Sequence, residues 1–356
     1  MTRARTLATA LRDRFAGQGA QVVEPPILLP ADVLLDLYGE DIRARAYTTG
    51  DPVRGEQMLR PDFTVPVVQM HLRGDDPAAR YTYAGEVFRR QDDVPDRANE
   101  YLQVGYEVFD IANPAQAEAE VFASLSETVA HLSLRAATGD IGILIAAVEG
   151  LHTSDQRKAA LRRHIWRPRR FRALFDRFAG RTPVPPSRAA LLHQDAISDA
   201  PLIGKRTSDE ITARIADLRA DAAEPPLSKS EAAAFDRLFA VRGSLPDAAR
   251  QLGELARDLP SITEAVAALQ ARIVALATRG VAVDTLEFEL TYGRTSMEYY
   301  DGFVFGLYAA AHPDLPPVVT GGRYNALTRQ LGNGNAAPAV GGVIRPDLVA
   351  LLEGDA

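Results

Sequence analysis

The segment YTYAGEVFRRQDDVPDRANEYLQVGYEVF, from Tyr81 to Phe109, is typical of two β-strands joined by a polar loop. In its second half two sets of residues alternate, Tyr101, Gln103, Gly105 and Glu107 against Leu102, Val104, Tyr106 and Val108. This alternation predicts a β-hairpin with one polar face. Gln103 and Glu107 point the same way on such a strand, with about 13 Å between their backbones. If another layer covers this face, the buried amide and carboxylate need partners, which a polar ligand supplies.

Composition excludes several classes of protein. The chain has 356 residues, 46% of them hydrophobic, and a net charge of −7, so it can build a large core but offers no global positive field for nucleic acid. Cysteine is absent and the six histidines show no HExxH spacing, so we expect no disulfide, metal site or cofactor. Charges are scattered through residues 1–20, and no window has eighteen uncharged apolar residues. We therefore expect no signal peptide, no membrane span and a cytoplasmic location.

The order of predicted elements divides the chain into a discontinuous core and an insertion. Residues 1–150 and 281–356 mix strands and helices, whereas residues 151–280 are mostly helical and are broken by proline clusters. Within the first part, Pro114–Leu134 has the composition of one long helix. The apolar run Asp140–Val148 predicts a strand.

Five separated motifs occur in one order along the chain. They are LRPDFT (59–64), YAGEVFR (83–89) followed by Arg97 and QVGYEVF (103–109), EYYDGFVF (298–305), GGRYNAL (321–327) and PAVGG (338–342). Together they resemble the catalytic core of class II histidyl-tRNA synthetases. The resemblance implies an α+β fold, in which helices flank an antiparallel sheet that carries a pocket for histidine and adenylate. It also implies a homodimer formed through Val22–Tyr38.

Seven residues stand at the histidine-handling positions of this family, and all but Asp62 match the family pattern. They are Asp62, Thr64, Arg89, Gln103, Glu107, Tyr299 and Tyr300. Carboxylates suit an amino group, and Arg89 suits a carboxylate or phosphate. Asp62 replaces a longer glutamate, and either Asp62 or Thr64 is suited to cap the following helix. Because Tyr299 and Tyr300 are adjacent in a predicted strand, we expect only one of them to face the pocket.

Positions that handle the nucleotide in the synthetases differ here. Thr295 stands where the family has an arginine that stabilises the reacting charge, and Leu348 where a helical arginine binds ATP. Gln91 replaces a glutamate that helps to hold ATP. Losing one group that meets transition-state charge costs roughly 3 to 4 kcal/mol. Two such losses would nearly abolish adenylate formation, so no catalytic residue is expected.

The end of the chain carries the last part of the resemblance. Few residues follow the final motif, where the synthetases continue into an anticodon-binding domain, and we expect that domain to be absent. A synthetase-like chain with these features resembles the regulatory subunits of ATP phosphoribosyltransferase. The resemblance implies a hetero-oligomer with a short catalytic subunit, which condenses ATP with phosphoribosyl pyrophosphate in the first step of histidine biosynthesis. It also implies histidine as effector, bound either in the pocket or at the subunit interface.

Two alternatives remain at this point. The first is an active class II synthetase-like enzyme that acts on a non-tRNA acceptor. The second is a tRNA-binding regulator that uses residues 157–172, which contain eight Lys or Arg and no acid. A solvated helix face is the simpler interpretation of this basic stretch, and the acidic net charge argues against tRNA as a partner.

Overall fold

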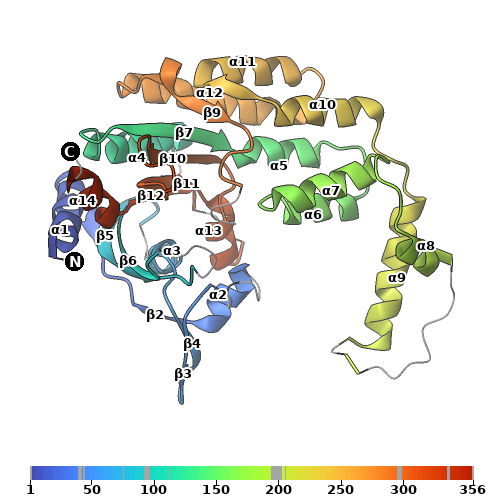
Figure 1. Ribbon diagram of the computed structural model, residues 1–356, viewed down its shortest axis with the longest axis horizontal. Coiled ribbons are helices and arrows are strands. Elements are labelled where there is room, and N and C mark those ends of the chain that lie inside the picture. The colour runs from blue at the N-terminus through green and yellow to red at the C-terminus, as the bar shows by residue number, and fades with distance from the viewer. Residues whose placement is uncertain are drawn as a thin grey trace.

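A nine-stranded sheet organises the fold (Figure 1). The computed structural model describes residues 2–38, 42, 45–74, 76–91, 97–110, 112–193, 203–204, 206–294, 299–334 and 337–354. The strand order is β1-β5-β6-β12-β11-β10-β7-β9-β8, antiparallel except for the pairs β1–β5 and β7–β9. The strands are β1 (Gln21–Val22), β5 (Ala79–Phe88), β6 (Glu100–Phe109), β7 (Leu134–Asp140), β8 (Arg242–Ser244), β9 (Glu287–Glu289), β10 (Phe303–Ala309), β11 (Val319–Arg323) and β12 (Ala339–Ile344). The expected hairpin is β5–β6.

A smaller sheet extends from the large one near the N-terminal part of the chain (Figure 1). Its order is β2-β4-β3, and α2 (Ala31–Tyr38) packs against β2 and β4. The strands are β2 (Leu28–Pro30), β3 (Thr48–Asp51) and β4 (Gly55–Leu59).

Helices cover one face of the large sheet. The helices α1 (Thr2–Gly17), α4 (Pro114–Thr128) and α14 (Pro346–Gly354) all contact β6. The ring of Tyr106 stacks on Phe15 of α1 with centroids 5.1 Å apart, and its hydroxyl donates to Glu120 of α4. Because side chains alternate along a strand, Gln103 and Glu107 face the opposite side.

Two further helices lie on that opposite side. They are α3 (Thr64–Arg73) and α13 (Asn325–Leu331), which contact each other. His71 of α3 stacks on Phe109 at 3.9 Å between ring centroids, which anchors α3 over the end of β6. The polar face of the hairpin is therefore covered, as the ligand hypothesis requires.

The middle of the chain is helical. It comprises α5 (Ile141–Glu149), α6 (Asp155–Arg163), α7 (Pro168–Phe178), α8 (Pro186–His193), α9 (Ser208–Ala223), α10 (Lys229–Phe239), α11 (Leu245–Leu255), η2 (Pro260–Ile262), α12 (Thr263–Thr278) and η3 (Val283–Thr285). The pair α8–α9 projects away from the sheet (Figure 1), whereas β8 joins the sheet edge and α12 packs on α4. The division at residues 151–280 stays a prediction.

The segment Pro260–Thr278 is the one helical stretch of the described chain that is long and apolar enough to cross a membrane. Its Arg272 is buried and bonded to Glu118 on α4 and to Asp140, at 2.6 and 2.8 Å. These contacts make α12 a packed helix of this fold.

Two local predictions were wrong. The run Asp140–Val148 is not a strand: Asp140 ends β7, and its carboxylate accepts the amide of Gly142 and caps α5. A short apolar run does not distinguish a strand from a buried helix, and the capping side chain decides here. The helix expected over Pro114–Leu134 ends at Thr128, because Leu134 begins β7.

Candidate functional site

A pocket of about 710 Å³ lies on the polar face of the sheet. Its volume falls within the range of about 300 to 1,000 Å³ that is common for small-molecule sites. The predicted ligand residues all line it, namely Asp62, Thr64, Arg89, Gln103, Glu107, Tyr299 and Tyr300. They come from β6, the residue after β5, the start of α3 and the segment before β10, so the tertiary structure joins residues more than 200 positions apart. Their role in binding stays a prediction.

Glu107 lies at the centre of this site. It is 1% exposed, and its two carboxylate oxygens accept hydrogen bonds from the hydroxyls of Tyr83 and Tyr324, at 2.7 and 2.6 Å. Burial raises the pKa of Glu107 to about 7, although the two tyrosine hydrogen bonds oppose the shift. The carboxylate is thus held in one orientation and is close to its titration point at neutral pH.

Two glycines on neighbouring strands make room for this arrangement. Gly105 lies opposite Tyr83 in the hairpin, and a Cβ there would be 2.0 Å from the tyrosine ring. Gly341 of β12 lies opposite Glu107, and a Cβ there would be 1.4 Å from its carboxylate. The glycines in QVGYEVF and PAVGG therefore leave the space that Tyr83 and Glu107 occupy.

Gln103 provides an unused acceptor on the same face of β6 as this carboxylate. Its side chain is 2% exposed, and its Oε1 atom has no hydrogen-bond partner among the residues that the structure describes. An unsatisfied buried carbonyl costs about 1 to 3 kcal/mol. A ligand with an N–H group would remove that cost, because amide oxygens accept and do not donate.

Asp62 and Thr64 line the pocket at the start of α3. Asp62 Oδ1 accepts the amide of Val65 at 3.4 Å, and its other oxygen lies 3.9 Å from Arg89. The cap position of α3 is Phe63, so neither Asp62 nor Thr64 is the helix cap itself.

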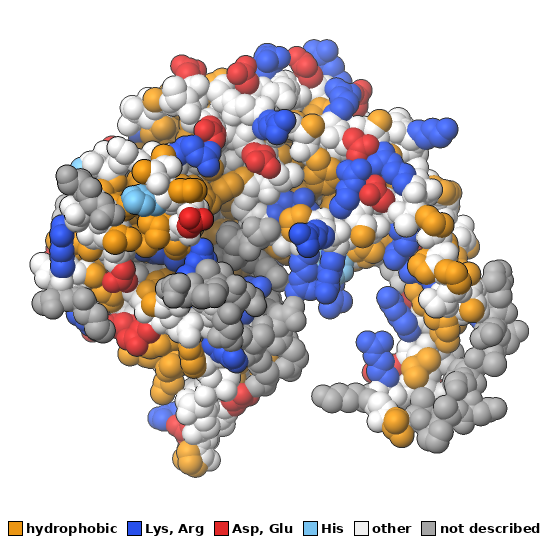
Figure 2. All heavy atoms as spheres, viewed as in Figure 1, with side chains coloured by type: hydrophobic (Ala, Val, Ile, Leu, Met, Phe, Trp, Pro, Cys, Tyr) orange, Lys and Arg blue, Asp and Glu red, His pale blue; other side chains and the backbone are white. Residues whose placement is uncertain are grey.

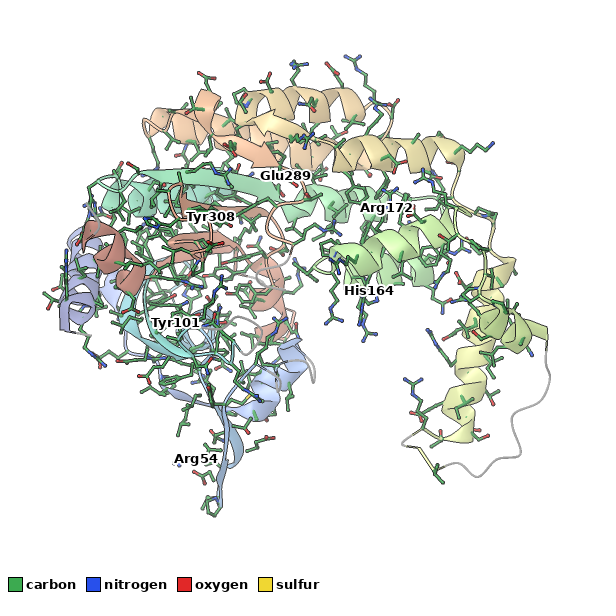
Figure 3. All side chains as sticks on the ribbon, in the orientation of Figure 1. Arg54, Tyr101, His164, Arg172, Glu289 and Tyr308 are labelled. Carbon is green, nitrogen blue, oxygen red and sulfur yellow. The ribbon has the colours of Figure 1, made fainter. Side chains whose placement is uncertain are left out.

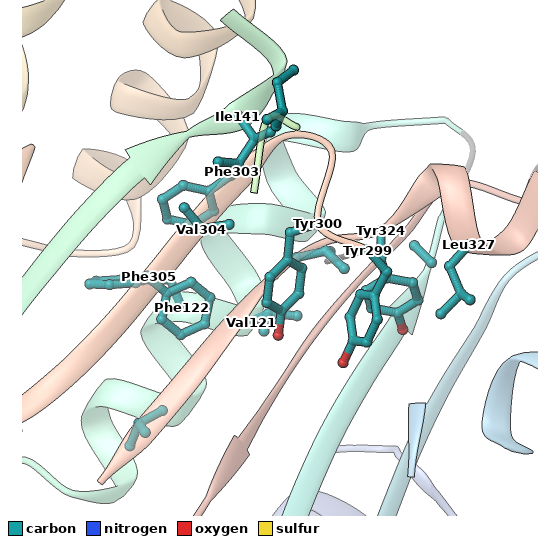
Figure 4. Close-up of a cluster of buried hydrophobic side chains, with 14 of the residues drawn as sticks. Val121, Phe122, Ile141, Tyr299, Tyr300, Phe303, Val304, Phe305, Tyr324 and Leu327 are labelled. Carbon is teal, nitrogen blue, oxygen red and sulfur yellow. The ribbon is translucent and has the colours of Figure 1, made fainter. Parts of the chain in front are cut away.

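The expectation that only one of two adjacent tyrosines faces the pocket was wrong. Both Tyr299 and Tyr300 line it, because they precede β10 and do not follow strand alternation. Their rings meet edge to face at 4.9 Å, and the hydroxyl of Tyr299 donates to Thr64 at 3.3 Å. Figure 4 shows their hydroxyl ends pointing to the same side as that of Tyr324.

A cluster of arginines also lines the pocket, next to Asp62. Arg89, Arg97 and Arg345 all line it, and the guanidinium of Arg345 lies 4.8 Å from the ring of Tyr101. Burial lowers the pKa of Arg345, and repulsion from Arg89 and Arg97 acts in the same direction. Tyr101 lies on β6, and Glu289 and Tyr308 lie toward the other edge of the sheet (Figure 3). This arginine cluster suits an anionic group.

The altered nucleotide positions are placed differently from one another. Gln91 lines the pocket, but its side chain donates to the carbonyl of Ala98 at 2.5 Å and so is already engaged within the hairpin. Leu348 lies outside the pocket lining and packs against the core. Thr295 lies outside the described residues. Its neighbour Arg294 is directed away from the pocket, between the rings of Phe171 and Phe239.

Sequence reasoning missed three residues of the site. Tyr83 and Tyr324 hold Glu107, and Arg345 belongs to the arginine cluster with Arg89 and Arg97. The sequence could have indicated Tyr83, because it lies opposite Gly105 in the predicted hairpin. A tyrosine opposite a glycine can lie over the neighbouring strand. Arg345 stands three residues before Leu348, so the loss of an arginine at 348 is accompanied by an arginine nearby.

Comparison with known proteins identifies the family of this chain. The family model described as histidyl-tRNA synthetase matches residues 1–200 and 209–349. A Brucella canis protein named ATP phosphoribosyltransferase regulatory subunit is 30% identical over an alignment of 380 positions, gaps included. The alignment covers 99% of this chain and 99% of that protein. The chain belongs to this family of regulatory subunits. This confirms the family resemblance, and the names of the relatives support a regulatory rather than a catalytic role.

Solved structures agree with the fold assignment of this regulatory-subunit family. A Bacillus halodurans protein described as an ATP phosphoribosyltransferase regulatory subunit/histidyl-tRNA synthetase has a TM-score of 0.68 and 21% identity. The match covers 99% of this chain and 79% of that one. The histidyl-tRNA synthetase of Nostoc has a TM-score of 0.64 and 17% identity, with 99% and 72% covered. The expected class II synthetase-like fold is confirmed.

Proposed function

We propose that this chain activates a short catalytic subunit of ATP phosphoribosyltransferase and that histidine bound in the pocket regulates the complex. The observation that carries the pocket assignment is the unpartnered Oε1 of Gln103, on the same face of β6 as the buried Glu107. The names of the curated relatives support the assembly with a catalytic subunit. The same proposal includes a cytoplasmic location. It also includes a core formed by residues 1–150 and 281–356, into which residues 151–280 are inserted.

The chemistry of histidine matches the distribution of groups in the pocket. Glu107 and Asp62 offer carboxylates for a cationic amino group, and Gln103 offers an acceptor for an imidazole N–H. Arg89 offers a cation for the ligand carboxylate. A coupling free energy of about 1 to 3 kcal/mol between this site and the catalytic subunit would change activity roughly 5- to 150-fold.

Two measurements test this function. The chain and a short catalytic subunit, expressed together, are expected to purify as one complex and to form phosphoribosyl-ATP faster than the catalytic subunit alone. Calorimetry on the isolated chain is expected to show heat on addition of histidine. If the two chains do not associate, the assembly is wrong; if wild-type chain gives no heat with histidine, the pocket assignment is wrong.

Histidine affinity is expected to depend on pH through Glu107. Its pKa of about 7 means that the carboxyl group is neutral below pH 7 and ionised above it. A cationic ligand prefers the ionised form, so affinity relative to a Glu107→Gln variant should fall as pH drops from 8 to 6, by up to about tenfold per pH unit below the pKa. Calorimetry on both proteins cancels the titration of free histidine. An affinity ratio that stays constant across this range would contradict the expectation.

A homodimer through residues 22–38 is part of the proposal. Val22, Ile27 and Leu28 are 41%, 45% and 47% exposed, which leaves apolar side chains for a second copy to cover. Leu28→Asp is expected to weaken the dimer at least about thirtyfold, as for a central interface residue. Light scattering after size-exclusion chromatography measures this. Val53→Asp, at the tip of the β3–β4 hairpin and 92% exposed, is the matched control and should leave the dimer unchanged.

A further inference from the structure

A second cavity lies where the projecting pair α8–α9 meets α6 and α7. Its volume is about 330 Å³, and its walls carry Arg157, Arg163, Arg177, Arg188 and Arg214 but only the acids Asp217 and Asp221. Cations therefore outnumber acids in its lining, in a chain whose net charge is −7. Figure 2 shows Lys and Arg side chains gathered over α6 and α7, beside the hollow that separates them from α9.

One carboxylate is shared among three of these arginines. Asp221 lies 2.7 Å from Arg157, 2.6 Å from Arg188 and 3.8 Å from Arg177. Arg157 is 6% exposed and also donates to the carbonyls of Pro225 and Glu224, so it is a buried anchor rather than part of a solvated face. The basic stretch 157–172 is thus partly built into the fold.

Arg177 is incompletely satisfied. Its Nε atom is buried and has no hydrogen-bond partner among the described residues, and its guanidinium lies 4.8 Å from the ring of Phe178. Burial lowers the pKa of Arg177, and repulsion from Arg188, Arg157 and Arg214 adds to the shift. An additional anion in the cavity would relieve both the repulsion and the missing hydrogen bond.

We propose that this cavity binds the phosphate group of a small molecule, with Arg177, Arg188 and Arg214 as its ligands. The planar fork of arginine matches phosphate oxygens, and a doubly charged anion offsets most of the excess cation. The cavity volume of about 330 Å³ is many times the share of one water molecule, about 30 Å³, which leaves room for a phosphate group. This site is separate from the histidine pocket and does not depend on the function proposed for it.

Binding would also join the projecting pair to the rest of the chain. The helix α9 has no buried residue, and Asp221 provides ion pairs that link it to α6 and α7. Arg177 lies on α7, whereas Arg188 and Arg214 lie on α8 and α9. An anion held between them adds a cross-link, so the amide protons of α9 should exchange more slowly when the site is filled.

Pyrophosphate is the probe for this proposal. Calorimetry at constant ionic strength is expected to show binding to the full chain, weakened about ten- to a hundredfold by Arg177→Gln. Arg214→Gln removes an exposed cation from the arm and should weaken binding without disturbing the core. The matched control is Arg250→Gln, on α11 and with a side chain 64% exposed, which should bind pyrophosphate as the wild type does. Pyrophosphate should slow hydrogen exchange in residues 208–223 only in those proteins that bind it, the wild type and Arg250→Gln.

Three results would overturn the proposal. One is no heat with pyrophosphate at millimolar concentration. Another is an equal loss in the Arg177→Gln and Arg250→Gln variants, since that would indicate a general effect of net charge. The third is a short single-stranded RNA that displaces pyrophosphate, binds far more tightly than pyrophosphate does and loses affinity in the Arg177→Gln variant, which would assign the arginines to a nucleic acid.

Discussion

Glu107→Gln is expected to weaken histidine binding to the isolated chain about 10- to 150-fold at pH 8. The amide keeps the size of the carboxylate and can still meet the hydroxyls of Tyr83 and Tyr324. It removes the negative charge that would face a cationic amino group, and a hydrogen bond to a charged group contributes about 1.5 to 3 kcal/mol. Isothermal titration calorimetry with histidine measures the change directly.

The matched control for this variant is Glu289→Gln. Glu289 lines the same pocket, but it is exposed and lies on β9, away from Gln103. The same chemical change there should leave histidine affinity within about twofold. Wild-type affinity in the Glu107→Gln protein would exclude the amino-acid end of the pocket as the histidine site, and would direct the search to the subunit interface.

Arg272→Met is expected to lower the free energy of unfolding by about 3 to 5 kcal/mol. Arg272 is 2% exposed and bonds to Glu118 and Asp140, which are themselves 3% and 4% exposed. Methionine fills similar space but leaves Asp140 as an uncompensated buried carboxylate, whereas Glu118 retains Arg323 at 2.6 Å. Removing one partner of a buried ion pair costs this much because the other charge stays desolvated. Urea unfolding followed by circular dichroism measures it.

An exposed ion pair provides the comparison for this stability measurement. Arg237 lies 2.6 Å from Asp258, and both side chains are more than half exposed. Arg237→Met should therefore cost less than about 1 kcal/mol. Equal losses in the two variants would mean that the buried cluster joining α12 to α4 and β7 contributes no more than a surface contact.

The sequence by itself determined the hairpin and the side of it that carries the site. A period of two forces Gln103, Gly105 and Glu107 onto one face, and this follows from strand geometry without any knowledge of neighbours. The order of the five motifs indicated the class of fold. Strict alternation failed at Tyr299 and Tyr300, because these residues precede β10.

Only the tertiary structure decided how the polar groups are paired. Glu107 meets Tyr324 from 217 positions away, and Arg345, directly after β12, reaches Tyr101 on the neighbouring strand β6. The same holds for Asp140, whose carboxylate caps α5 and binds Arg272, so that an apolar run after it becomes a helix. Local periodicity gives the direction of a side chain along its own element. Which donor or charge it meets depends on how distant elements pack, and that sets the pKa of Glu107 and the unused acceptor of Gln103.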